Sequence, residues 1–182
     1  MPSFDSWTLE TIRSQGAMMN WIEEARFEWS AATLQALRNI LESKTIVLIT
    51  DGERKWFETY ALSTINKTSN ERPIIPIVSI DSLYPSFDSV SGGEMIDVID
   101  DMLDITYKGD YIFWYVGRGD DKRADIAKRN DESYLWIMDE VFINALSLKS
   151  YDKKLDIKLL QLFELFNTSL SAALFGEVDI DE

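Results

Sequence analysis

The 182-residue sequence contains no cysteine and no histidine. The missing cysteine excludes disulfides, thiolate metal ligands and thiol nucleophiles, and the missing histidine excludes imidazole ligands and histidine-based catalytic triads. Histidine is also the side chain whose ordinary pKa lies between about pH 5 and 8. Because these absences remove the commonest nucleophilic and acid–base mechanisms, we predict a protein that is not an enzyme.

Basic residues are scarce. The 18 Lys and Arg stand against 32 Asp and Glu, a formal net charge of −14, and such a surface repels a phosphate backbone, so we expect no direct nucleic-acid binding. No apolar run approaches the roughly 18 residues of a membrane-spanning helix. The first five residues lack the basic start and the apolar run of a signal peptide. We therefore expect no membrane contact and a cytoplasmic location.

Apolar residues are plentiful. They make up 46% of the sequence, and aromatic residues make up 12%, which is typical of a globular protein. A chain of this length can bury enough surface to be stable on one hydrophobic core. No internal repeat, low-complexity segment or linker divides it. We predict one domain over residues 1–182.

Four short segments have the β-branched and aromatic composition of strands: residues 45–50, 74–80, 111–116 and 134–138. The first is apolar on both faces, as in parallel sheets that helices cover on each side. Helical segments follow the strands at residues 53–65, from 91 onward, at 122–128 and at 155–175. This alternation predicts an α/β fold with a mainly parallel sheet flanked by helices. Helices over residues 5–15 and 20–42, and the long last helix, are additions to that sheet.

Local signals mark where several helices begin and end. Asp5 or Ser6 is expected to cap the first helix. Ser91 and Glu94 have the spacing of a capping box, and Gly176 has the position of a glycine that ends the last helix.

The helix over residues 20–42 carries two apolar stripes. The first one is continuous and is made of Ile22, Ala25, Trp29, Ala32, Ala36 and Ile40. Phe27, Leu34 and Leu41 form the second, about 140° around the helix. Since a surface helix needs only one such stripe, we predict that the second is the interface of a homo-oligomer.

The carboxyl ends of the predicted strands are where open parallel sheets bind ligands. The Gly117-x-Gly119 loop has the form of a phosphate-binding turn, but Asp120 follows it at once and its carboxylate would repel phosphate. Asp51, Asp81 and Asp120 together would offer hard oxygen ligands to Mg²⁺, although aspartates at strand ends are more often helix caps. We therefore predict no cofactor and no metal.

Several segments, taken in order, resemble the HobA family of bacterial replication-initiation regulators, which bind the initiator DnaA. The segments are residues 21–26, 55–57, 72–76 leading to 81–83, and 113–115. The family looks like a modified sugar-isomerase (SIS) domain of Rossmann or flavodoxin type, akin to DiaA. The resemblance implies a non-catalytic adaptor, a homotetramer that binds the N-terminal region of DnaA and promotes its assembly at the replication origin. The alternative is an SIS-like phosphosugar-binding or isomerase protein, although acids replace the family's serines in residues 50–54 and 117–120.

The resemblance also implies partner-binding residues. DiaA-type relatives use a Leu-Phe pair near the C-terminus followed by an acidic tail, and Leu174 and Phe175 match that pair. Phe175 lies about 100° away from Leu174 and the apolar stripe of its helix, so it is the expected exposed anchor. Trp21 with Glu24 is the second candidate, because tryptophan is enriched at binding hot spots.

Overall fold

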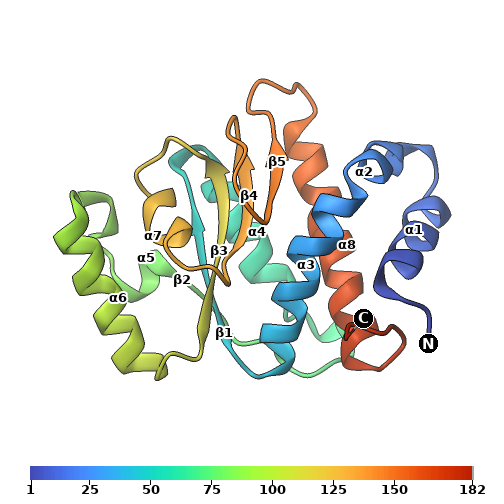
Figure 1. The fold of residues 1–182 in the computed structure, drawn as a ribbon, viewed down its shortest axis with the longest axis horizontal. Helices are drawn as coiled ribbons and strands as arrows, with labels where there is room; N and C mark the ends of the chain where they lie inside the picture. The colour runs from blue at the N-terminus through green and yellow to red at the C-terminus, as the bar shows by residue number, and fades with distance from the viewer. Residues whose placement is uncertain (182) are drawn as a thin grey trace.

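The computed structural model describes residues 1–181, and within them a five-stranded sheet carries helices on both faces (Figure 1). All neighbouring strands pair in parallel, in the order β2-β1-β3-β4-β5. The strands are β1 (Thr45–Thr50), β2 (Ile77–Ser79), β3 (Tyr111–Arg118), β4 (Tyr134–Met138) and β5 (Ala145–Leu148). The helices are α1 (Phe4–Ser14), α2 (Asn20–Glu24), α3 (Arg26–Leu41), α4 (Lys55–Thr64), α5 (Ile80–Leu83), α6 (Gly93–Tyr107), α7 (Ala124–Lys128) and α8 (Leu155–Leu174).

The sheet separates two hydrophobic cores, because successive side chains of a strand point to opposite faces. In β1, Ile46 and Leu48 belong to the core under α1, α3, α4 and α8. Val47 and Ile49 belong to the second core, under α5, α6 and α7. The apolar composition of residues 45–50 therefore reflects burial on both faces, and the predicted α/β fold is confirmed.

Aromatic side chains fill the larger core. Trp114 of β3 lies with its ring centroid 5.2 Å from that of Trp136 on β4 and 5.1 Å from that of Phe166 on α8. The ring centroid of Phe57 on α4 lies 5.8 Å from that of Trp114 and 5.7 Å from that of Trp136. Such tilted and edge-to-face pairs add roughly 0.5–1.5 kcal/mol each beyond area burial. The cluster ties α4 and α8 to the centre of the sheet.

The sheet differs from the prediction at both edges. Only Ile77–Ser79 forms a strand within residues 74–80, because Pro76 precedes it and α5 begins at Ile80. The fifth strand, Ala145–Leu148, was not predicted. It is only four residues long and follows Asn144, whose positive φ of 54° ends an irregular loop.

Helix boundaries differ as well. The predicted helix over residues 20–42 is two helices, because the backbone leaves helical geometry at Ala25. Ser3, and not Asp5 or Ser6, caps α1 through a bond from the Ser6 amide. The predicted capping box is wrong, since Gly92 precedes α6 and no side chain caps that helix.

Candidate partner-binding surface

The crevice at the carboxyl ends of the strands is occupied by the chain's own charges. Asp51 is 2% exposed and accepts three bonds, from the backbone N–H of Arg118 at 2.8 Å and from the backbone N–H and guanidinium of Arg54 at 3.0 Å each. A carboxylate with three donors already in place is satisfied, so Asp51 has a structural task.

Arg123 fills the neighbouring part of the crevice. It is 3% exposed and donates to the carbonyl oxygen of Thr50 at 2.7 Å and to both carboxylate oxygens of Asp81 at 2.7 and 2.9 Å. Asp88 and Lys55 complete the network by pairing with Arg123 and Asp81 respectively. Burial alone would raise the pKa of Asp81, but bonds from Lys55 and Arg123 outweigh it and hold that pKa below its usual value.

Gly117 allows these groups to come so close together. A Cβ atom at this position would lie 2.6 Å from the Tyr115 hydroxyl oxygen and 2.8 Å from Asp51 Oδ2. The glycine therefore makes room for the chain's own side chains rather than for a phosphate. The carboxyl ends of β1 and β3 are therefore filled by the side chains of Asp51, Tyr115 and Arg123.

The aspartates considered as Mg²⁺ ligands do not form a metal site. Asp51 and Asp81 face arginines, and Asp120 is exposed and pairs with Arg118 through two contacts of 2.9 Å. Among residues 1–181, no three acidic side chains are grouped so as to hold a metal ion. Over the same stretch, none of the helices is both long enough and apolar enough to cross a membrane.

Phe175 is held in an exposed position at the end of α8. Gly176 adopts a φ of +67°, and two bonds close the helix, from the Gly176 amide to Ala173 O and from the Glu177 amide to Ala172 O. This is the Schellman arrangement that the glycine predicted. Phe175 is 55% exposed, whereas Leu174 is half-buried and packs against the larger core.

The acidic tail after Phe175 folds back onto the N-terminus. Val178 is buried, the Asp179 amide donates to Pro2 O at 3.0 Å, and Ser3 and Asp179 form an isolated parallel bridge. Arg38 of α3 then donates to Ile180 O at 2.6 Å. The tail is therefore a fixed border beside Phe175.

Trp21 and Glu24 lie on α2, near the other end of α8. The Trp21 indole N–H donates to Gln161 Oε1 at 2.7 Å, and the Lys158 ammonium lies 4.6 Å from the centroid of its ring. Glu24 is exposed. Because Gln161 and Phe175 are separated by roughly 20 Å of helix axis, the two predicted partner-binding sets are not brought together.

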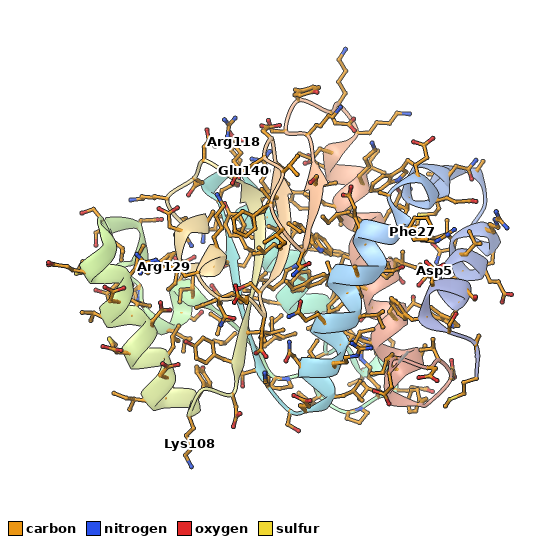
Figure 2. All side chains as sticks on the ribbon, viewed as in Figure 1. Asp5, Phe27, Lys108, Arg118, Arg129 and Glu140 are labelled. Atoms are coloured by element: carbon orange, nitrogen blue, oxygen red, sulfur yellow. The ribbon has the colours of Figure 1, made fainter. Side chains whose placement is uncertain are left out.

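The predicted oligomer stripe is only partly free. Phe27 is 70% exposed, with the Arg26 guanidinium 4.4 Å from its ring centroid and Asp5 2.9 Å from Arg26 Nε (Figure 2). Leu41 is exposed as well. Leu34 packs against the chain's own larger core, so it is not the fully free side chain that the spacing had suggested.

Sequence reasoning also missed an exposed apolar stripe on α6. It consists of Met95, Val98, Met102 and Ile105. The signal is present in the sequence as spacings of three, four and three residues, and Ile96, Ile99 and Leu103 of the same helix are buried.

Comparisons with known proteins agree along the whole chain. The family model HobA, described as a DNA replication regulator, matches residues 1–180. The DNA replication regulator protein HobA of Helicobacter pylori is 30% identical, over 99% of this chain and all of that protein. A crystal structure of a HobA–DnaA (domain I–II) complex from Helicobacter pylori matches with a TM-score of 0.73 and 29% identity, over 98% of this chain and 99% of that one. A structure of Helicobacter pylori HobA alone matches with a TM-score of 0.75 and 27% identity, at the same coverage. The chain belongs to the HobA family of DNA replication regulators.

Proposed function

We propose that this chain is a non-catalytic cytoplasmic adaptor that binds the N-terminal region of DnaA and promotes DnaA assembly at the replication origin. The observation that carries the proposal is the full-length match, in sequence and backbone, to a HobA protein solved in complex with DnaA domains I and II. The absence of cysteine and histidine and the salt-bridged crevice support a role without catalysis. The chain then acts through its surface.

Phe175 is the first candidate for the contact with DnaA. It combines an exposed ring, a backbone fixed by the Schellman bonds, and the ordered acidic tail beside it. An anchor on a fixed backbone loses less conformational entropy when a partner covers it than one on a flexible segment would. Trp21 and Glu24 provide a second candidate surface on α2, where the indole is already held by Gln161.

The binding test is calorimetric titration with DnaA domains I–II. Phe175→Ala is expected to cost about 2 kcal/mol of binding if Phe175 is a hot spot, or roughly thirtyfold in Kd. Tyr151→Ala is the matched control, since Tyr151 is also an exposed aromatic residue but lies in the loop before α8. Unchanged affinity together with unchanged stability would remove Phe175 from the site and move the search to Trp21 and Glu24.

A phosphosugar-binding role is the alternative, and Asp51, Arg54 and Arg123 speak against it because they fill the place where a phosphate would lie. Thermal unfolding with a panel of sugar phosphates distinguishes the two functions. A ligand at a hundred times its Kd stabilises a protein by about 2.7 kcal/mol, so a clear rise in Tm with any of them would favour the alternative.

The adaptor is proposed to act as a homotetramer, with Phe27, Leu34 and Leu41 of α3 at an interface between copies. Exposed Phe27 and Leu41 on a helix whose opposite side is already buried support this assembly. Light scattering should give a mass near four times 21.0 kDa, and Phe27→Asp should lower it. A stable monomer at micromolar concentration would contradict this proposal and leave the DnaA contact to be tested separately.

A further inference from the structure

The outer surface of α6 is apolar and lies far from every residue proposed above. Ile105 is 81% exposed and Val98 52% exposed, and Met95 and Met102 continue the same stripe. Helix α6 stands at the edge of the molecule opposite α1 (Figure 1). Its other face packs into the smaller core through Ile96, Ile99 and Leu103. The stripe thus lies on the side of α6 that faces away from this core.

A groove runs beside this stripe, between α6 and α5. Leu83 and Tyr84 line it from the α5 side, and Met102 and Thr106 line it from α6. Leu83 and Met102 are both exposed at its rim. The stripe and the groove together form an elongated apolar surface, which we call the α5–α6 face. Amphipathic helices of partner proteins dock with their apolar side chains in apolar grooves, and Met102 joins the groove to the stripe here.

Carboxylates border the face on the side away from the groove. Within Gly93–Tyr107 there are five acids and no Lys or Arg: Glu94, Asp97, Asp100, Asp101 and Asp104. At about 100° per residue, Glu94 and Asp101 lie directly next to Val98 and Ile105 around the helix. Arg129 neutralises Asp97 at 2.5 Å and is the basic residue that pairs with this helix in the described part of the chain.

The acidic border of the α5–α6 face determines which kind of partner can bind there. A second copy docking through the same face would bring two acidic borders together, and like charges placed opposite one another oppose association. A helix with Lys or Arg beside an apolar stripe of its own would instead place opposite charges along the border while burying the methionines, valine and isoleucine. Methionine-rich apolar surfaces adapt readily to such helices.

We propose that the α5–α6 face is a docking site for a basic amphipathic helix of another protein. The proposal is independent of the contact with DnaA through Phe175 or Trp21, because none of its residues lies on α2 or at the end of α8. The apolar stripe supplies the buried area, and the acidic border supplies the preference for a basic partner and the orientation of its helix.

The probe is a fluorescently labelled eighteen-residue helical peptide of leucine and lysine, with the leucines on one face, titrated by anisotropy with the full chain. A peptide of leucine and glutamate with the same pattern is the control. Val98→Ser/Ile105→Ser is expected to weaken binding of the lysine peptide about tenfold or more. The matched control is Val141→Ser/Ile143→Ser, which removes two exposed apolar side chains from the loop before β5 and should leave binding unchanged.

A second pair of variants tests the border. Glu94→Gln/Asp101→Asn should weaken binding severalfold and reduce its salt dependence, whereas Asp131→Asn/Asp156→Asn, with the same change in net charge, should have little effect. The proposal would be overturned if the lysine and glutamate peptides bound equally well. It would also be overturned if each α6 variant lost as much affinity for the lysine peptide as its control variant. A fall in mass by light scattering for Val98→Ser/Ile105→Ser would also overturn it, because the face would then be an interface between copies.

Discussion

Asp100 offers a direct test of the electrostatics of α6. Its carboxyl group is half-buried, and burial, followed by the charges of Asp104, Asp97 and Asp101, raises its pKa from 3.8 to about 6, while Arg129 acts in the opposite direction. The folded protein therefore binds a proton more tightly at this site than the unfolded chain does. Its stability should fall as the pH rises from about 4 to about 6.

The expected magnitude follows from the size of that shift. A difference of roughly two pH units corresponds to about 3 kcal/mol, and solvent screening of a partly exposed group reduces this to about 1 kcal/mol. Asp100→Asn removes the charge and keeps the shape, so we expect it to stabilise the fold by about 1 kcal/mol at pH 7. At pH 4 the variant and the parent should unfold alike.

Urea denaturation at a series of pH values between 4 and 8 measures this difference. Asp131→Asn is the control, because the Asp131 carboxylate is exposed and is not among the charges that act on Asp100, and surface substitutions usually change stability by less than about 0.5 kcal/mol. If Asp100→Asn shows the same stability difference at every pH, or destabilises the fold at pH 7, then burial does not raise the pKa of Asp100 and the reasoning fails.

Three further substitutions test other parts of the fold. Asp81→Ala removes the main partner of the buried Arg123 guanidinium, and urea denaturation should show a free energy of unfolding about 3 kcal/mol lower. Because the folded structure lowers the pKa of Asp81, the stability that this carboxylate contributes should be lost below about pH 4. Gly117→Ala forces a methyl group against Tyr115 and should lower stability by about 1–3 kcal/mol. Val178→Ala should lower the free energy of unfolding by about 1.5 kcal/mol. A protease should then cleave the C-terminal tail of this variant before it cleaves the rest of the chain.

Much of the fold follows from local composition. Residues 45–50 and 134–138 are strands with the predicted bounds, because each is a short β-branched or aromatic run buried on both faces. The exposure of Phe175 followed from the angle between it and the apolar stripe of α8. Trp29, which belongs to the continuous apolar stripe predicted for residues 20–42, is fully buried.

What the sequence did not predict depends on contacts between distant residues. Arg123 joins Thr50, Asp81 and Asp88, and only the order of the strands in the sheet brings those residues to one place. The docking of the acidic tail has the same origin, since the Asp179 amide bonds to Pro2 O and Arg38 bonds to Ile180 O, both pairs being far apart in the sequence. Local patterns carry no information about such partners.

The bridge between Ser3 and Asp179 has a practical consequence, because it places the two ends of the described chain side by side (Figure 1). Affinity tags on either terminus would therefore emerge close together, beside the tail that follows Phe175, and could hinder a partner that binds there. The same proximity makes the chain suitable for circular permutation. A short linker joining the ends, with new termini opened at exposed Tyr151 in the loop before α8, would place both ends at the opposite end of that helix from Phe175 and leave the sheet order intact.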